Sequence, residues 1–364
     1  MGRHDRLWKG ILISGLLLIA AASAQAEQHH RFQGDHEITV MTRNLYFGAD
    51  LSSLLAAPNL DALIAGVTTV FGKAQFTDFR QRALALADEI AAVEPDLVGL
   101  QEAVIWRSQF PPDGPVTPAS KVEYDFLQIL LDALADRGLR YEPVVVSDGF
   151  DAEAPRLAVP GTPLLQDIRL TDRDVLLARQ QHRLGDQKLS NPQAAKFAAN
   201  VTFQLVGQTI SSGKGWVAVD VNIRGKKFRV VNTHLEVPEV SAAVQLAQGA
   251  ELLAGPADTN LPVILIGDLN SRADGTGTAT YGNLIAAGFV DAWTIANPAN
   301  DGNTCCQSEL LFSVAPFDKR VDVVLFRGDF SVANAKLVGA NPTFSNPPLW
   351  ASDHAGVAAT LEFR

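Results

Sequence analysis

The sequence predicts an α+β fold in which two β-sheets form a sandwich. The apolar run 261–266 is typical of a strand that is buried on both faces. Apolar residues at a spacing of three and four over 79–93 and 123–136 predict two amphipathic helices. No internal repeat and no domain boundary interrupts a region of roughly 330 residues, which is long for one domain but within reach of a two-sheet sandwich.

Further strands follow from apolar or alternating runs bounded by turn residues, and they cover most of the chain. They are predicted at 37–42, 96–102, 141–147, 174–178, 203–206, 215–223, 227–232, 320–326, 332–338 and 356–361. A helix is predicted over 243–253. Three stretches rich in proline, glycine or polar residues are predicted to be irregular: 107–122, 149–166 and 180–195.

The first 26 residues have the pattern of a secretory signal peptide. Basic residues precede an apolar run over 11–22, and the small-x-small pattern Ala24-Gln-Ala26 follows it. The apolar run is shorter than the roughly 20 residues that a membrane-spanning helix needs. We therefore expect export to the periplasm or the medium, with 27–35 as a flexible lead-in and 36–364 as the folded domain.

The mature protein is acidic. The full chain has 30 basic and 40 acidic residues and a net charge of −10. Removing the signal peptide, with three basic residues and one acidic residue, changes the net charge to −12. An acidic surface argues against tight binding of nucleic acid, because that affinity normally comes from lysine and arginine. The argument is weaker for an enzyme that uses divalent cations, since the metal screens substrate phosphates.

Polar residues with catalytic or metal-binding capacity recur at the ends of the predicted strands. The positions are Asn44, Glu102, His234, Asp268 with Asn270, Asp322, and Asp353 with His354. Each one alone fits an ordinary turn. Together they supply carboxylates for a hard cation, an orienting base for water, and donors for the charge of a phosphate transition state. A zinc hydrolase would show closer histidine spacing, and none is present.

The chain resembles the endonuclease/exonuclease/phosphatase superfamily. The matching segments, in the family's order, are Thr42-Arg-Asn44, Leu100-Gln-Glu102, Asn232-Thr-His234, Gly267-Asp-Leu-Asn270, Arg320-Val-Asp322 and Ser352-Asp-His354. No single segment is specific to this family. The occurrence of all six in the family's order, over nearly all of the mature chain, is specific. The resemblance implies a four-layer α/β/β/α sandwich of two mixed sheets with helices on the outer faces.

The resemblance also implies a role for each of these positions. Glu102, Asn44 and Asp353 are expected to bind Mg²⁺, with Mn²⁺ or Ca²⁺ as alternatives. Asp268 is expected to orient and deprotonate water, while Asn270 and His354 donate to the transition state. Asp322 is expected to hold His354 in the useful tautomer, and His234 to assist the leaving group.

Several assignments remain open at the level of sequence. Glu142 and Asp174 are both candidates for the carboxylate partner of His234. Arg43 and Arg173 are the candidate substrate-binding residues, with Arg179 as a third basic group. Asp50 is a candidate for a second metal, although a place on a loop fits it better.

The adjacent cysteines Cys305 and Cys306 have two readings. They form either a vicinal disulfide that braces a loop or a pair of free thiols. We expect no catalytic role. We also expect no metal site there, because no histidine or further cysteine lies nearby in the sequence.

The residues favour a secreted Mg²⁺-dependent hydrolase of phosphodiester bonds, with an extracellular nuclease first. A sphingomyelinase-like phospholipid phosphodiesterase and an inositol or nucleotide phosphomonoesterase are the alternatives, so the substrate is DNA, RNA, a membrane lipid or a small phosphate ester. A binding module without activity would have lost a catalytic position, and none is missing. No stable protein partner is implied.

Overall fold

The computed structural model describes residues 36–363, apart from 160, 181–187, 206–207, 314 and 346–347. The predicted signal peptide, 1–26, and the predicted lead-in, 27–35, lie outside the described residues. Within the described part of the chain, no helix has the length and apolar character needed to cross a membrane.

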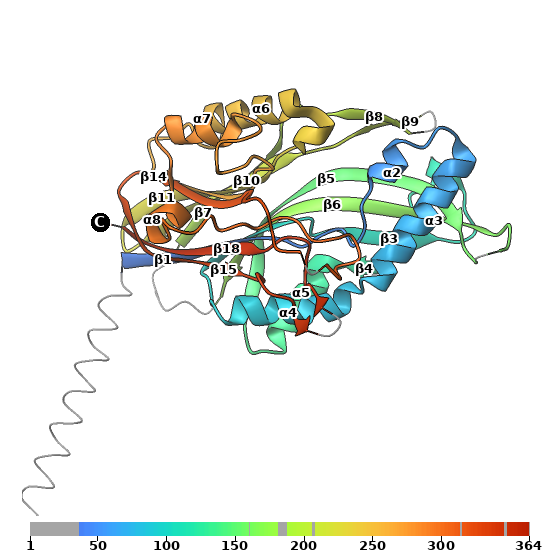
Figure 1. Ribbon diagram of the computed structural model, residues 1–364, viewed down its shortest axis with the longest axis horizontal. Coiled ribbons are helices and arrows are strands. Elements are labelled where there is room, and N and C mark those ends of the chain that lie inside the picture. Colours follow the sequence, from blue (N-terminus) through green and yellow to red (C-terminus); the bar gives the residue numbers. More distant parts are fainter. Residues whose placement is uncertain are drawn as a thin grey trace, which may run out of the picture.

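Two large mixed sheets pack face to face (Figure 1). The first has the strand order β15-β18-β1-β2-β6-β3-β4, and β5 pairs with β6 outside this path. Its strands are β1 Glu37–Asn44, β2 Leu97–Gln101, β3 Ile105–Gln109, β4 Lys121–Asp125, β5 Tyr141–Leu157, β6 Leu165–Arg179, β15 Phe330–Val338 and β18 Gly356–Phe363. β18 runs antiparallel to β1, and β2 runs parallel to it. The last described strand therefore lies beside the first.

The second sheet has the strand order β13-β14-β12-β11-β10-β7. Its strands are β7 Lys188–Lys196, β10 Gly215–Ile223, β11 Lys226–His234, β12 Val263–Asp268, β13 Val290–Asp291 and β14 Asp322–Arg327. Two smaller pairs are separate from both large sheets: β8 Thr202–Leu205 with β9 Gln208–Ser211, and β16 Phe344–Ser345 with β17 Pro348–Leu349.

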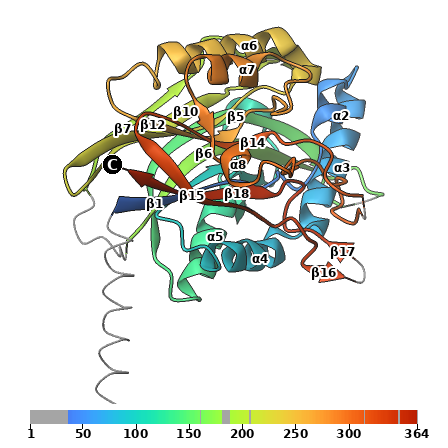
Figure 2. The same ribbon diagram turned by 60° about the vertical axis from the view of Figure 1, so that its left-hand side comes forward.

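Helices cover the outer face of each sheet. The helices are α2 Ser52–Leu55, α3 Leu60–Phe76, α4 Phe79–Ala91, α5 Phe126–Ala135, α6 Pro238–Ala254, α7 Thr280–Ala286 and α8 Ala292–Ala296, with a 3₁₀ turn at Gly114–Val116. Of these, α8 packs into the core between the sheets through Ala292 and Trp293. Figure 2 shows α4 and α5 on one side of the molecule and α6 and α7 on the opposite side. Leu86 of α4 shares a core with Leu100 of β2, and Leu252 of α6 shares another with Leu265 of β12. This confirms the predicted α/β/β/α sandwich.

The strand β12 shows why the run 263–266 is apolar throughout. Ile264 and Ile266 face the core between the two sheets. Val263 and Leu265 belong to the core beneath α6 and α7. Because successive side chains of a strand point to opposite faces, a strand in the middle of this sandwich has no solvent-facing side.

A buried polar contact joins the two sheets near their catalytic ends. The side chain of Gln101 on β2 donates to Asn232 Oδ1 on β11 at 2.6 Å. Asn232 Nδ2 donates in turn to the carbonyl oxygens of Leu100 and Val175, at 3.1 and 3.0 Å. Both amide side chains are fully buried, so their hydrogen bonds fix how one sheet sits on the other.

The three stretches predicted to be irregular contain strands. Residues 149–157 lie on β5 and 165–166 on β6, and this antiparallel pair continues, after two register shifts, as far as Leu157 opposite Leu165. Residues 107–122 contain the end of β3 and the start of β4. Residues 180–195 contain most of β7. The proline and glycine residues of these stretches predict irregular structure. The backbone is nevertheless extended, because pairing with neighbouring strands sets its conformation.

Candidate active site

Three of the predicted catalytic residues lie in one row across the second sheet. His234 is opposite Asp268 in the register of β11 and β12, and Asp268 is opposite Asp322 in that of β12 and β14. His234 Nε2 lies 3.6 Å from Asp268 Oδ2. All three residues are buried. The ends of neighbouring strands thus gather side chains that lie far apart in the sequence.

Glycine at 267 allows this row to form. Its φ is +146°, and a Cβ atom there would lie 2.1 Å from the carbonyl oxygen of Thr233. Any other residue would push β12 away from β11, and with it Asp268 from His234. The glycine of Gly267-Asp-Leu-Asn270 is therefore a packing requirement of the site.

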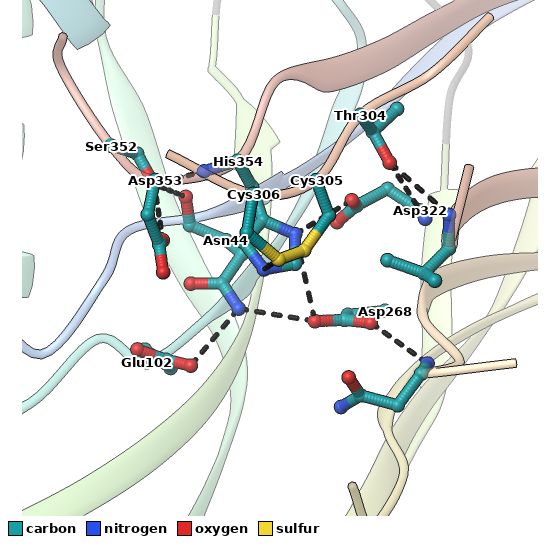
Figure 3. The surroundings of a disulfide bond; sticks show 12 residues. Asn44, Glu102, Asp268, Thr304, Cys305, Cys306, Asp322, Ser352, Asp353 and His354 are labelled. Atoms are coloured by element: carbon teal, nitrogen blue, oxygen red, sulfur yellow. Dashed lines mark hydrogen bonds and ion pairs between the residues drawn. A yellow bond between two sulfur atoms is a disulfide. The ribbon is translucent and has the colours of Figure 1, made fainter. Parts of the chain in front are cut away.

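The first sheet contributes Asn44 and Glu102. Asn44 Nδ2 donates to Glu102 Oε1 at 3.0 Å and to Asp268 Oδ2 at 3.2 Å, so its amide connects the two sheets. Glu102 Oε2 accepts from the backbone N–H of Phe47 at 2.7 Å. Figure 3 shows Glu102 and Asp353 on one side of Asn44 and Asp268 on the other.

His354 is held by Asp322. Its Nδ1 lies 2.8 Å from Asp322 Oδ2 and 3.8 Å from Asp268 Oδ2. Burial acts to lower the pKa of His354, but Asp322, Asp268 and Asp353 outweigh burial and raise it to about 10. His354 is therefore an imidazolium at neutral pH and can donate to an anionic oxygen. Asp322 and His354 are therefore in contact, and the role of Asp322 in selecting a tautomer of His354 stays a prediction.

Asp268 is ionised despite its burial. Burial acts to raise the pKa of its carboxyl group, but His354 and His234 outweigh burial and lower that pKa. Its Oδ1 accepts from the backbone N–H of Asn270 at 2.9 Å. The side chain of Asn270 donates to the carbonyl oxygen of Leu235 at 3.0 Å. Asn270 thus holds Asp268 and the segment after His234 in place.

Lys214 belongs to the site and was missed in the sequence. It precedes β10, and its Nζ lies 3.0 Å from Nδ1 and 3.2 Å from Nε2 of His234. Asp172 Oδ2 lies 3.9 Å from the same nitrogen. No motif marks Lys214; the only local signal is a lysine between Gly213 and Gly215, directly before a predicted strand.

The structure distinguishes between the two carboxylates considered as partners of His234. Glu142 accepts a hydrogen bond from Gln180 at 2.9 Å and is exposed. Asp174 is buried near the site, and its Oδ1 has no hydrogen-bond partner. Burial first, then the charges of Asp172, Glu102 and Asp268, raise the pKa of Asp174. Asp174 therefore belongs to the acidic surroundings of Lys214.

The two arginines predicted to bind substrate have other partners. Arg43 is buried, and its guanidinium forms an ion pair with Glu89 at 2.8 Å. It also donates to the carbonyl oxygen of His354. Arg173 donates to the carbonyl oxygen of Ala103 at 2.7 Å and pairs with Asp125. These contacts correct the prediction, because both side chains brace the site from behind.

Two further candidates also serve the fold. Arg179 pairs with Glu94 at 2.7 Å and with Asp96 at 3.3 Å. Asp50 accepts from the backbone N–H of Ser52 at 2.8 Å and from its hydroxyl at 2.9 Å. Asp50 also lies in the wall of the cavity beside the active site.

The backbone is strained at three positions around the site. Tyr46, Glu102 and Asn270 have φ values of 62°, 58° and 48°, in the left-handed region that favours glycine. Each such conformation costs on the order of 1–3 kcal/mol, and it persists only where surrounding contacts enforce it. All three follow closely on strands that end at the site.

Cys305 and Cys306 form a disulfide beside His354 (Figure 3). Cys306 Sγ lies 3.9 Å from His354 Nε2. No histidine lies near the pair in the sequence, but folding places His354 beside it. Backbone hydrogen bonds from Ala355 to Thr304 and from Gln307 to Asp353, at 2.7 and 2.8 Å, fix the cysteine loop around the histidine.

The acidic groups fit a divalent cation. Burial first, then the charges of Asp353 and Asp172, raise the pKa of Glu102 to about 8. Burial also raises the pKa of Asp353. Carboxyl groups that resist ionisation beside one another gain from a bound cation, and carboxylate and amide oxygens are ligands that Mg²⁺ prefers. Glu102 and Asp353 supply such carboxylates, whereas the amide oxygen of Asn44 accepts from the backbone N–H of Tyr46 at 2.9 Å. Metal binding by these three residues stays a prediction.

Comparison with known proteins decides the family. A family model described as "Endonuclease/Exonuclease/phosphatase family" matches residues 44–354. The chain belongs to the endonuclease/exonuclease/phosphatase family. Members of this family hydrolyse phosphoester bonds and generally use a divalent metal ion. The match begins at Asn44 and ends at His354, the first and last of the positions predicted to act in catalysis or metal binding.

Solved structures of the family share this fold. An endonuclease/exonuclease/phosphatase family protein from Bacteroides thetaiotaomicron is 16% identical, with a TM-score of 0.55; the alignment covers 90% of this chain and 95% of that one. Its counterpart from Leptotrichia buccalis is 18% identical, with a TM-score of 0.51 and coverage of 90% and 100%. One from Beutenbergia cavernae is 20% identical, with a TM-score of 0.52 and coverage of 90% and 72%. The sequence matches no curated protein.

Proposed function

We propose that the protein is an exported hydrolase of phosphodiester bonds that depends on a divalent metal ion. The observation that carries this proposal is the opposite charge of two neighbouring catalytic groups. The pKa of Asp268 is lowered and that of His354 is raised to about 10, so a carboxylate and an imidazolium face the same space. A base for water and a donor for a phosphate oxygen are then both ready at neutral pH.

The residues divide the reaction between them. Water attacks phosphorus as the bond to the leaving oxygen breaks. The proton of the water passes to Asp268, and the leaving oxygen takes a proton from solvent water. His354 donates to a non-bridging oxygen of the phosphate. Burial and Lys214 lower the pKa of His234 to about 3, so His234 is neutral. The positive charge on that side belongs to Lys214, which His234 positions, and we assign Lys214 to a second phosphate oxygen.

Glu102, Asp353 and Asn44 are the residues that would hold the metal ion. We propose Mg²⁺, with Mn²⁺ or Ca²⁺ as alternatives. When bound, the ion supplies positive charge to the phosphate oxygens and offsets the acidic surroundings of the site. Glu102 would bind the ion as a carboxylate.

The sequence favours a nucleic acid as substrate, ahead of a phospholipid or a phosphomonoester. The charge around the site supports a different ranking of these three substrate classes. Eight carboxyl groups and two lysines, Lys214 and Lys319, line the adjoining cavity. A single phosphate is accommodated by one lysine and a metal ion, whereas the following phosphates of a nucleic acid would meet acidic side chains. A singly charged phosphodiester fits these surroundings better.

Hydrolysis of bis-p-nitrophenyl phosphate by the chain 27–364 tests the reaction. We expect activity with Mg²⁺, none after EDTA, and recovery when Mg²⁺ is added back. Asp268→Asn should lower kcat/KM about 1,000-fold, in the range of general-base catalysis. The exposed Asp136→Asn is the matched control and should retain wild-type activity. Full activity in EDTA or in Asp268→Asn would falsify the mechanism.

Export is tested separately, with the full-length chain expressed in a bacterial host. N-terminal sequencing of protein recovered from the periplasm or medium should begin at Glu27. Retention in the cytoplasm with residues 1–26 still attached would contradict the signal peptide.

A further inference from the structure

An apolar chamber adjoins the active site. The cavity has a volume of about 510 Å³, and Glu102, His234, Asp268 and His354 line one part of it. Away from the carboxyl, histidine and lysine side chains of its lining, its wall is mostly hydrocarbon. Figure 1 shows the elements that build this part: α2 and α3, the β8–β9 hairpin, and the neighbouring stretches of β5 and β6.

The apolar wall comes from several parts of the chain. It includes Leu51 before α2, Leu54 of α2, Leu63 of α3, Phe150 of β5, Leu170 of β6 and Leu205 of β8. Leu51, Leu54 and Phe150 are only partly buried, although they pack against the core. Apolar side chains that remain partly exposed around a cavity of this size are typical of a site for a small ligand.

The chamber is unsuited to a nucleic acid. A sugar-phosphate chain placed there would lose water from its hydroxyl and phosphate groups without polar partners in return. Its next phosphate would also approach Asp50, Glu236 or Glu239, which line the same cavity. The occupant that matches these surroundings has one phosphate and an apolar remainder.

We propose that the chamber holds the hydrocarbon chain of a single-chain phosphodiester lipid while its phosphate meets Asp268, His354 and Lys214. This inference rests on the proposed phosphodiester hydrolysis and names the substrate of the same site. A cavity of about 510 Å³ is in the range that encloses one ligand of roughly drug size. It has room for one hydrocarbon chain, so the substrate enters as a single molecule.

A pair of synthetic diesters tests the proposal directly. Methyl p-nitrophenyl phosphate and dodecyl p-nitrophenyl phosphate have the same scissile bond, leaving group and charge, and they differ only in the chain. Each buried methylene strengthens binding about fourfold. Below the critical micelle concentration, we expect kcat/KM to rise with chain length and to be at least about 100-fold higher for the dodecyl ester.

Variants locate the effect in the chamber. Leu51→Gln should reduce the ratio of the two kcat/KM values about tenfold, because it places an amide in the apolar wall. Leu60→Gln is the matched control: Leu60 is 47% exposed at the start of α3, and it does not line the cavity. It should leave the ratio unchanged. Thermal unfolding of both variants checks that they are folded.

The outcomes separate the two proposals. Equal kcat/KM values for the methyl and dodecyl esters would overturn the chamber assignment and leave the phosphodiesterase in place. Failure to hydrolyse either ester with Mg²⁺ would remove the phosphodiesterase itself. A chain-length effect that occurs only above the critical micelle concentration would also overturn the chamber assignment, because it would come from a lipid surface. Faster cleavage of plasmid DNA than of the dodecyl ester would overturn the chamber assignment as well.

Discussion

Lys214 and His234 form a contact in which the lysine bears the charge. Its Nζ lies 3.0 Å from Nδ1 of the imidazole ring. Burial acts to lower the pKa of Lys214, but Asp172 and Asp174 outweigh burial and raise it. Burial and Lys214 together lower the pKa of His234 to about 3. The pair therefore presents an ammonium group, backed by a neutral histidine, to the space above Asp268.

Removing this ammonium group should cost much of the activity. We expect Lys214→Ala to lower kcat/KM about 100-fold, the loss that follows removal of one donor to a transition-state oxygen. Lys214→Arg should retain most of it. Without the neighbouring charge the pKa of His234 should rise, so protonation of His234 should restore part of the missing positive charge, and the deficit of the variant relative to the wild type should shrink as the pH falls from 7 to 5. Wild-type kcat/KM in Lys214→Ala would contradict the assignment.

Metal binding should release a proton from Glu102. Because its pKa is raised to about 8 in the metal-free protein, Glu102 is mostly protonated at pH 7. A cation that binds the carboxylate must displace this proton. We expect about one proton per Mg²⁺ at pH 7 and markedly less at pH 9, measured with an indicator dye in weakly buffered solution. Glu102→Gln should abolish the release, and release that persists in this variant would be evidence against Glu102 as a ligand.

Because of the ion pair of Asp322 and His354, the stability of the protein should fall as the pH rises into the alkaline range. The folded-state pKa of His354, about 10, lies above the unfolded value of about 6.5. The stability it contributes is therefore fully present below pH 6.5 and is lost as the pH rises through 10. In EDTA, Asp322→Asn should lower the unfolding temperature most at pH 6–8 and little at pH 11. A difference between the proteins that does not change with pH would show that Asp322 acts by packing alone.

Loss of the hydrogen-bonded contact between the two sheets should lower the stability of the protein more than its catalytic activity. Asn232→Ala removes a side chain that makes three buried hydrogen bonds, to Gln101, Leu100 and Val175. We expect the free energy of unfolding to fall by about 3 kcal/mol, since buried partners are left unsatisfied. Asn283→Ala, on the exposed face of α7, should change it by less than about 0.5 kcal/mol. Urea denaturation measures both, and equal effects would contradict the role of Asn232.

The sequence predicts this fold well where local pattern and tertiary structure agree. The run 263–266 is apolar throughout because both faces of β12 are covered. The helix α4 begins after Asp78, whose carboxylate accepts from the backbone N–H of Arg80 at 3.1 Å, and capping residues of this kind are visible in a sequence. The strand-end positions Asp268 and His354 are visible for the same reason, because they sit directly beside apolar strands.

What the sequence does not predict depends on partners far along the chain. Residues 151–157 are extended because they pair with 165–171 of β6, and no periodicity inside the segment shows this. Lys214 reaches His234 only after β10 and β11 pair. Arg43 precedes Asn44 and resembles a substrate ligand, yet its side chain points to Glu89, since neighbours on a strand face opposite ways.

The place of β18 has a consequence for the newly made chain. β18 is the last of the described strands to be synthesised, yet it lies between β15 and β1. Until it emerges, β1 keeps one unpaired edge, and Asp353 and His354 are absent from the site. Once β14 has been synthesised, the chain contains the catalytic groups that precede this point but still lacks the imidazolium of His354. A nascent chain that lacks this region would therefore lack the group to which we assign donation to the phosphate oxygen.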